Sequence, residues 1–277
     1  MNSRLNLISE QIEGHYLLTR EWERLLAGQG ELERLRTQAI LARYLPRPPA
    51  VIFDVGGGAG VYAFPLAQQG YQVHLIDRVE LHLEQARSHA AASGVALASI
   101  TMGDARHLDI PSGSADALLL LGPLYHLVEP SDRLRALREA RRILKPGGIL
   151  FAAAISRFAS LLDGLARGFF QDAEFRKIVT TDLASGQHRN PTDDPRYFTT
   201  AYFHRPEELA AEVRDAAFDD VEVLAVEGPA WSAGRIGEVW DDPVQRQSLM
   251  EFLSLIEREP STLGASAHLI AVGTRPD

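Results

Sequence analysis

Hydrophobic and polar residues follow two different patterns along this chain. Apolar residues recur with helical spacing from about Leu5 to Tyr44, and the segment ends at a proline-rich stretch, residues 46–49, which cannot continue a helix. From Ala50 onward, short apolar runs typical of buried strands alternate with amphipathic stretches typical of helices. The pattern predicts a helical N-terminal extension, residues 1–48, and an α/β domain, residues 49–277.

Strict alternation of strand and helix is typical of a doubly wound, mostly parallel sheet with helices on both faces. The predicted strands are residues 51–55, 71–76, 97–102, 116–121 and 149–155, and the predicted helices are 61–69, 79–93 and 130–144. Two later runs, residues 220–227 and 266–273, predict closing strands, with helices at about 206–217 and 243–258. Segments at about 156–204 and 228–264 are predicted to be insertions that, with the N-terminal extension, cap the domain.

Composition and charge narrow the classes of function. The 277 residues are 45% hydrophobic and include no cysteine, so disulfides, thiolate metal sites and cysteine nucleophiles are excluded. The net charge of −9 repels phosphate backbones, which disfavours nucleic acid as a partner. The N-terminus carries charges at Arg4, Glu10 and Glu13 where a signal peptide needs an apolar run, and no later stretch approaches the ~20 apolar residues of a membrane span. We therefore expect a soluble cytoplasmic protein, and the oligomeric state is left open.

A glycine loop follows the first predicted strand. Residues 51–55, VIFDV, lead directly into GGGAG, where glycines permit a tight turn and close approach of a ligand to the backbone. The next strand ends at Asp77, 19 residues after Gly58, where an acid can accept hydrogen bonds from both ribose hydroxyls of a nucleotide-like ligand. This pair predicts a nucleotide-like cofactor.

Two classes of cofactor fit the loop. Residues 58–63, GAGVYA, satisfy the dinucleotide pattern of nicotinamide and flavin enzymes. Asp54, two residues before Gly56, would repel a diphosphate but attract a ligand that carries an ammonium and a sulfonium group. The carboxylate therefore favours a cationic amino-acid cofactor.

From about Ala50 to Gly273, the sequence resembles the class I S-adenosylmethionine-dependent methyltransferases. Four segments carry the resemblance in their order and spacing: DVGGGAG (54–60), LID (75–77), GDARHLDIP (103–111) and LKPGGILF (144–151). The resemblance implies a seven-stranded sheet of order 3-2-1-4-5-7-6 with the last strand antiparallel. It also implies that Lys145 to Gly148 form a structural turn before the fifth strand.

The resemblance further implies which residues hold S-adenosylmethionine and its product S-adenosylhomocysteine. The glycine loop would hold the methionine part, Asp77 the ribose, and Asp104 with Ala105 the adenine. The cofactor-binding candidates are Asp54, Gly56, Gly58, Gly60, Asp77, Arg78, Gly103, Asp104, Ala105, Leu121 and Gly122.

Methyl transfer requires an acceptor held in line with the methyl group and, where the acceptor is protonated, a base. The family's acceptor side follows the fourth strand, which makes Tyr125 and His126 candidates. His126 is interpreted either as a general base or as a packed wall of the acceptor pocket, and His204 is a second candidate base. The aromatic residues between 169 and 203 either line a lid over the acceptor or pack as core. His82 and His89 are interpreted as facing solvent, and no residue spacing predicts a metal site.

The sequence favours a methyltransferase that acts on a small molecule. Three alternatives stay open: a protein or RNA acceptor, a non-catalytic cofactor-binding module, and a dinucleotide oxidoreductase. The position of the N-P-P-Y signature for exocyclic nitrogens reads G-P-L-Y here, residues 122–125, which disfavours nucleic-acid bases as acceptors. Whether oxygen, nitrogen or carbon accepts the methyl group is not determined by the residues.

Overall fold

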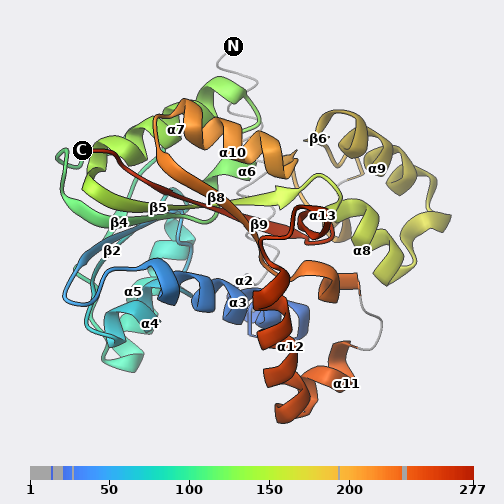
Figure 1. Ribbon diagram of the computed structural model, residues 1–277, viewed down its shortest axis with the longest axis horizontal. Helices are drawn as coiled ribbons and strands as arrows, with labels where there is room; N and C mark the ends of the chain where they lie inside the picture. Colours follow the sequence, from blue (N-terminus) through green and yellow to red (C-terminus); the bar gives the residue numbers. More distant parts are fainter. Residues whose placement is uncertain (1–13, 15–20, 27, 193, 233–235) are drawn as a thin grey trace. The chain divides into compact units, whose positions relative to one another are not determined.

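A computed structural model describes residues 14, 21–26, 28–192, 194–232 and 236–277 (Figure 1). The chain divides into two compact units, each built from three separate segments. The first unit contains residues 1–37, 154–206 and 223–269, and the second contains residues 38–153, 207–222 and 270–277. The first unit thus contains most of the predicted N-terminal extension and the whole of both predicted insertions. The predicted domain boundary at residue 48 stays a prediction.

The second unit is built on parallel strands that are nearly continuous hydrophobic runs. In spatial order they are β3 (Ser99–Met102), β2 (Gln72–Asp77), β1 (Val51–Val55), β4 (Ala115–Leu120) and β5 (Leu144–Ser156), and β5 extends into the first unit. All residues of β4 except Asp116 are buried, as a strand covered on both faces requires. Every strand predicted before residue 156 is confirmed, with ends shifted by a few residues.

Helices cover both faces of these strands. In Figure 1, α4 (Ala63–Gln68) and α5 (Glu80–Ser93) lie on one side, and α7 (Pro130–Ile143) and α10 (Pro206–Asp215) on the other. Each coincides with a predicted helix. A four-residue helix, α6 (Pro123–His126), follows β4 and was not predicted separately.

The predicted strand order is confirmed: β9 (His268–Thr274) corresponds to strand 7 of that order and lies between β5 and β8 (Asp219–Ala225), which corresponds to strand 6. Strand β9 pairs with both β5 and β8. The amide of Ser156 donates to Ala267 O, and the amide of Gly147 donates to Arg275 O. These pairings show that β9 runs antiparallel to β5.

Two short strands were missed by the sequence analysis: β6 (Gln187–His188) and β7 (Ala201–His204). They form an antiparallel pair, and β7 also pairs in parallel with the end of β5. Both lie in the predicted insertion at 156–204. Segments of two and four residues are too short to show a hydrophobic period, so their pairing is set by tertiary contacts.

The first unit is otherwise mainly helical. Its elements are α2 (Glu21–Arg24), α3 (Gly28–Tyr44, whose last residues belong to the second unit), α8 (Ala159–Arg167), η1 (Phe169–Gln171), α9 (Ala173–Ser185), η2 (Pro195–Tyr197), η3 (Gly228–Ser232), α11 (Ile236–Asp241), α12 (Pro243–Ile256) and α13 (Pro260–Leu263). The predicted helical extension is confirmed over α2 and α3, while its residues 1–13 and 15–20 lie outside the described residues.

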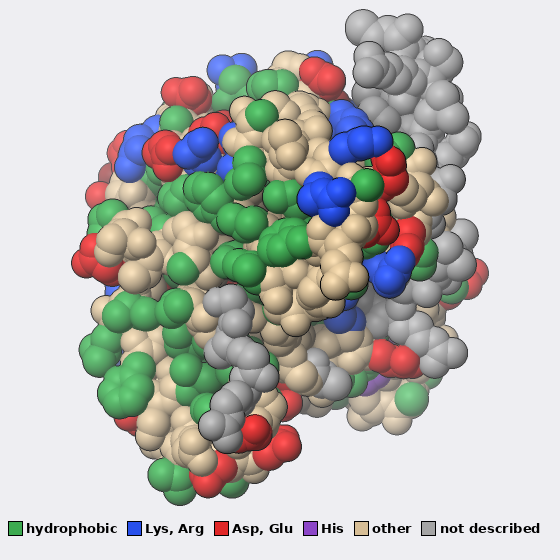
Figure 2. Space-filling view, turned by 90° about the vertical axis from the view of Figure 1, so that its right-hand side faces the viewer, with side chains coloured by type: hydrophobic (Ala, Val, Ile, Leu, Met, Phe, Trp, Pro, Cys, Tyr) green, Lys and Arg blue, Asp and Glu red, His purple; other side chains and the backbone are tan. Residues whose placement is uncertain are grey.

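Figure 2 shows hydrophobic side chains gathered in patches on one face. In α12, Val244 is 74% exposed and Leu255 80% exposed.

The predicted turn at Lys145 to Gly148 is wrong in part, because these residues lie inside β5. The register with β4 shifts here, from Ala115 opposite Leu144 to Ala117 opposite Ile149, so the segment bulges while it stays paired. On the other edge it is held by Arg275, whose amide donates to Gly148 O over 2.8 Å. The pairing partner lies about 130 residues away in sequence, beyond the range of local turn signals.

Within the part of the chain that is described, no helix combines the length and the apolar character needed to cross a bilayer.

Candidate functional site

The predicted cofactor residues lie together in the second unit, at the carboxyl ends of the parallel strands. This edge is where α/β sheets of this kind bind ligands. The amide of Gly56 donates to Ile76 O over 2.7 Å, and the amide of Gly103 donates to Asp77 O over 3.0 Å. These bonds join the ends of β1, β2 and β3.

The glycine loop leaves no room for side chains at three positions. Gly56 has a φ of +70°, and a Cβ there would lie 2.4 Å from Cγ of Pro123. A Cβ on Gly60, φ +91°, would lie 2.8 Å from Phe64. Gly57 was not among the predicted cofactor-binding residues, but it is as crowded as Gly56. A Cβ at this position would lie 2.5 Å from Oδ2 of Asp54 and 2.4 Å from Leu75. Gly58 has a φ of +57° but open space around it.

Asp54 lies directly below this loop in the central strand, paired with Leu75 on one side and Leu119 on the other. Its side chain is completely buried, and neither carboxylate oxygen has a hydrogen-bond partner among the described residues. Burial, helped by the negative charge of Asp77, raises the pKa of Asp54 to about 7. A buried carboxylate without a hydrogen-bond partner favours a positively charged ligand, because such a ligand would stabilise its ionised form.

Asp77, at the end of β2, accepts three hydrogen bonds. Its Oδ2 accepts from the amide of Gly58 over 2.8 Å, and its Oδ1 accepts from the amide of Val79 over 2.8 Å. The third contact is with Nδ1 of His82, 3.2 Å from Oδ1. Asp77 thus ties the glycine loop to the start of α5. Arg78, beside it, is exposed.

The prediction that His82 and His89 face solvent is wrong. His82 is 8% exposed and turns toward Asp77. His89 is partly buried, and its ring meets the edge of Phe64 with centroids 4.4 Å apart. A residue in the first helical turn points its side chain back toward the helix start, which for His82 is the end of β2. The only sequence signal for this contact was the five-residue spacing from Asp77.

Asp104, after β3, is held by Arg106, which the sequence analysis did not select. Both carboxylate oxygens accept from the guanidinium, Oδ2 over 2.6 Å, and Arg106 also contacts Asp132 of α7 over 2.8 Å. Burial alone would raise the pKa of Asp104, but the bonds to Arg106 and the charges of Arg106 and Arg78 lower it. Asp104 therefore carries negative charge at neutral pH, and the neighbouring Ala105 is buried.

The residues after β4 meet the glycine loop. A Cβ on Gly122 would lie 3.0 Å from Gly56 O, so the two turns touch through their backbones. Leu121, Tyr125 and His126 are partly buried, and the rings of Tyr125 and His126 lie edge to face with centroids 4.7 Å apart. The catalytic roles of Tyr125 and His126 stay predictions.

His204, the second candidate base, lies in the first unit at the end of β7. Its side chain is completely buried against Tyr202, with ring centroids 4.7 Å apart. Its role also stays a prediction.

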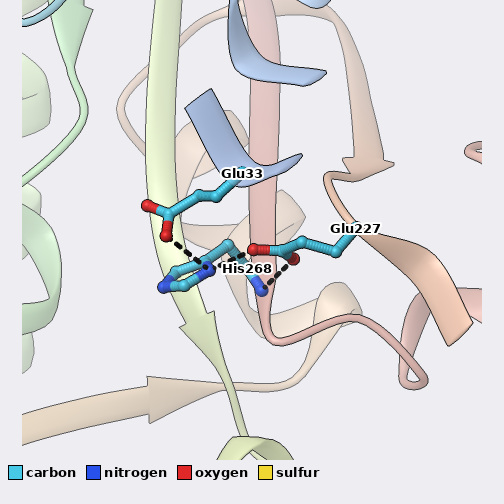
Figure 3. A group of neighbouring side chains, drawn as sticks. All are labelled: Glu33, Glu227 and His268. Carbon is cyan, nitrogen blue, oxygen red and sulfur yellow. Dashed lines mark hydrogen bonds and ion pairs between the residues drawn. The ribbon is translucent and has the colours of Figure 1, made fainter. Parts of the chain in front are cut away.

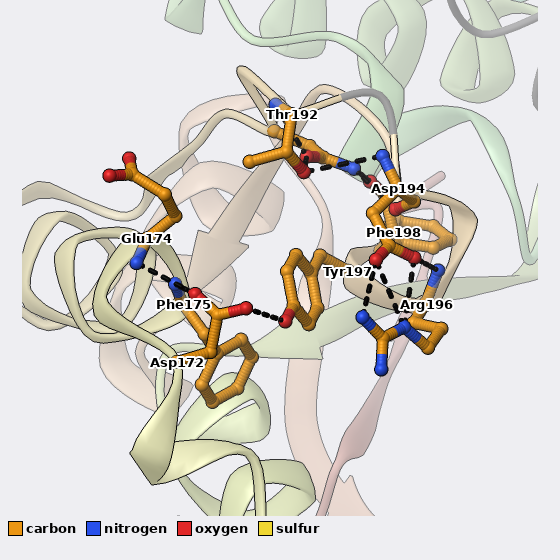
Figure 4. Close-up of polar contacts among 9 residues, drawn as sticks. Asp172, Glu174, Phe175, Thr192, Asp194, Arg196, Tyr197 and Phe198 are labelled. Carbon is orange, nitrogen blue, oxygen red and sulfur yellow. Dashed lines mark hydrogen bonds and ion pairs between the residues drawn. The ribbon is translucent and has the colours of Figure 1, made fainter.

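Aromatic residues of the 156–204 insertion form a small core. Phe175 and Tyr197 are buried at its centre, with centroids 5.0 Å apart, and Phe169 and Phe170 pack around them. Figure 4 shows the polar contacts beside it, including the Tyr197 hydroxyl, which donates to Asp172 over 2.7 Å. Asp172 also caps α9 through the amides of Glu174 and Phe175. These aromatic side chains therefore support the core interpretation.

A second charged cluster lies in the first unit (Figure 3). Nδ1 of His268 lies 2.5 Å from Oε1 of the fully buried Glu227 and 3.8 Å from Glu33. Burial by itself lowers the pKa of His268, but the charges of Glu33 and Glu227 outweigh it and raise the pKa to about 9. Glu33 is also paired with Arg24 over 2.7 Å, and Glu227 accepts from the Ser266 hydroxyl. Two carboxylates are therefore matched by two cationic groups.

Comparison of the sequence with known proteins shows the family of this chain. Residues 52–148 match the family model described as "Methyltransferase domain". The ubiquinone biosynthesis O-methyltransferase of Vibrio parahaemolyticus is 30% identical over 165 residues, which cover 52% of this chain and 69% of that protein. The chain belongs to the class I S-adenosylmethionine-dependent methyltransferases. S-adenosylmethionine is accordingly the cofactor of its family.

Two further relatives define how far the likeness extends. The ubiquinone biosynthesis O-methyltransferase of Methylocella silvestris is 35% identical over 117 residues, 42% of this chain and 44% of that protein. The chain thus spans less than half the length of that methyltransferase. The crystal structure of a possible histamine N-methyltransferase from Thermotoga maritima has a TM-score of 0.56 at 20% identity, covering 95% of this chain and 99% of that one. That likeness concerns the fold.

Proposed function

We propose that this chain is an enzyme that transfers a methyl group from S-adenosylmethionine to a small-molecule acceptor and releases S-adenosylhomocysteine. The observation that carries the proposal is the carboxylate of Asp54, completely buried below the glycine loop with no hydrogen-bond partner among the described residues. A buried carboxylate is stabilised by an opposite charge. S-adenosylmethionine offers an ammonium and a sulfonium, whereas a dinucleotide offers a negatively charged diphosphate.

The residues around Asp54 fit the rest of such a cofactor. The crowded glycine loop lets a ligand approach the backbone closely, which suits the methionine part. Asp77 would accept from the ribose, and Asp104 with Ala105 would face the adenine. Both acids are fixed by donors before any ligand arrives, Asp77 by Gly58 and Val79 and Asp104 by Arg106.

The chain's part in the reaction is mainly to position the acceptor. When bound, S-adenosylmethionine supplies an electrophilic methyl group on its sulfonium. Tyr125 and His126, after β4, would form one wall of the acceptor site and exclude water from it. Where the accepting atom carries a proton, a ring nitrogen of His126 would take that proton as the acceptor attacks.

A small-molecule acceptor is supported by two observations. The net charge of −9 disfavours nucleic acid, and two curated relatives are named for ubiquinone biosynthesis, a small-molecule pathway. A protein or RNA acceptor and a non-catalytic cofactor-binding module are the alternatives that experiment must exclude.

Calorimetric titration of the chain with S-adenosylhomocysteine, S-adenosylmethionine and NADH tests the cofactor assignment. We expect micromolar binding of the first two and loss of that binding in Asp77→Ala. Binding of NADH alone would contradict the proposal. Turnover is then measured as transfer of a labelled methyl group to a panel of phenols, amines and activated carbon acids. Cofactor binding without transfer to small molecules, to protein or to RNA would instead favour the non-catalytic module.

A further inference from the structure

The side chain of His82 is buried against the carboxylate that the proposed function assigns to the ribose. His82 is 8% exposed, and its Nδ1 lies 3.2 Å from Oδ1 of Asp77. An ionised carboxylate only accepts hydrogen bonds, so Nδ1 must be the donor. The imidazole also lies near the glycine loop, since a Cβ built on Gly58 would be 3.9 Å from Nδ1.

The donors around Asp77 leave it one open position. A carboxylate offers about two acceptor sites on each oxygen. On Oδ1 both are filled, one by the amide of Val79 and one by His82. On Oδ2 the amide of Gly58 fills one site, and the second is left for a ligand. The open site adjoins the glycine loop, because Gly58 bonds the same oxygen.

We propose that His82 is a positioning residue for the cofactor: it fills the second acceptor site of Asp77 Oδ1, fixes the carboxylate plane and directs the open site on Oδ2 toward one ribose hydroxyl. This inference rests on the proposed function.

Fixing the plane matters because Asp77 is otherwise held through one bond on each oxygen. A carboxylate that rotates about its χ2 angle would present a different lone pair to the ribose and would lose alignment with it. Preorganised acceptors bind more tightly, since less freedom is lost when the ligand arrives. Removal of the His82 donor should therefore weaken binding of ligands that carry ribose hydroxyls.

The test compares two substitutions at position 82. His82→Asn places an amide nitrogen where Nδ1 lies and keeps a donor, whereas His82→Leu fills similar space without one. We expect His82→Leu to weaken binding of S-adenosylhomocysteine by about tenfold, and His82→Asn to stay within about threefold of the unaltered chain. His89→Leu, seven residues along the same helix and packed on Phe64, is the matched control and should bind as the unaltered chain does.

A ligand analogue separates positioning from folding. For the analogue of S-adenosylhomocysteine that lacks both ribose hydroxyls, all four chains should bind with the same weakened affinity, which would also show that each altered chain is folded. Equal binding of S-adenosylhomocysteine by His82→Leu and the unaltered chain would overturn the inference. An equal tenfold loss with the analogue, or a failure of His82→Asn to restore binding, would also overturn it. Failure of the unaltered chain to bind S-adenosylhomocysteine at all would overturn the proposed function itself, and the inference with it.

Discussion

Asp54 is the most unfavourably placed charge in the proposed site. Its pKa is raised to about 7, above the ordinary value of 3.8, so the folded chain binds this proton more tightly than the unfolded chain does. The free energy of unfolding should then fall as pH rises from about 4 to about 7, by at most roughly 4 kcal/mol from this group. Asp54→Asn should remove this pH-dependent loss. The unfolding free energy of the variant, relative to that of the unaltered chain, should therefore be higher at pH 8 than at pH 5. Urea unfolding of both chains at the two pH values checks this, and an equal difference at both would contradict it.

Gly57 tests the steric argument for the loop. Gly57→Ala places a methyl group 2.5 Å from Asp54 Oδ2 and 2.4 Å from Leu75, so the loop must shift. We expect a loss of about 1–3 kcal/mol in unfolding free energy and clearly weaker binding of S-adenosylhomocysteine. Gly237→Ala, where a Cβ meets nothing within 4 Å, is the control. Calorimetry that found normal cofactor affinity in Gly57→Ala would show that the loop is not closely approached.

His126 tests the assignment of a base. If it takes the acceptor's proton, His126→Ala should reduce methyl transfer by about 10²–10⁴-fold while S-adenosylhomocysteine binds with little change. Single-turnover measurement of the methyl-transfer rate decides this. An unchanged rate would leave His126 as part of the acceptor wall alone.

At the residue scale, the sequence predicted the acids but not their partners. Asp54, Asp77 and Asp104 were found because each occupies a fixed place relative to a strand end. His82 and Arg106 were missed because a donor is recognised by the direction of its side chain, and sequence gives only its spacing. Gly57 was missed because its constraint is the space taken by Asp54 rather than a positive φ.

At the scale of elements, β9 carries a charge that should control stability at high pH. The pKa of His268 is raised to about 9 from 6.5, so its contribution is fully present below about pH 6.5 and is lost as pH rises through 9. His268→Gln should therefore cost about 2–3 kcal/mol of unfolding free energy at pH 6 and much less at pH 10. Denaturant unfolding at the two pH values measures this. The ring of His268 also packs against Trp231, with centroids 6.0 Å apart. An equal loss of unfolding free energy at both pH values would mean that this packing, rather than the charge, is what His268 contributes.

Strands and helices of the parallel sheet were predictable because burial on both faces makes each strand a continuous apolar run. The strands β6 and β7 and the paired segment at Lys145 to Gly148 were not. Each depends on partners that are distant in sequence: β5 for β7, and Arg275 for Gly148. Local patterning carries no information about such partners.

At the scale of the whole molecule, strand order followed from resemblance rather than from local pattern. The order with β9 between β5 and β8 agrees with the family, and the family is shown by the relative from Vibrio parahaemolyticus. Acceptor identity is a different matter. Specificity depends on where individual side chains lie in three dimensions, which local sequence patterns do not give.

The most direct test of the proposed cofactor site is the proton balance of cofactor binding. Titration of the unaltered chain with S-adenosylhomocysteine at pH 7, in buffers that differ in ionisation enthalpy, reports how many protons are released. An ammonium that binds beside Asp54 should ionise it and release roughly half a proton, since its pKa is about 7 in the free chain. Asp54→Asn should release none and bind more weakly. Binding without proton release, or equal release by both chains, would contradict the assignment of Asp54 to the cofactor's positive charge.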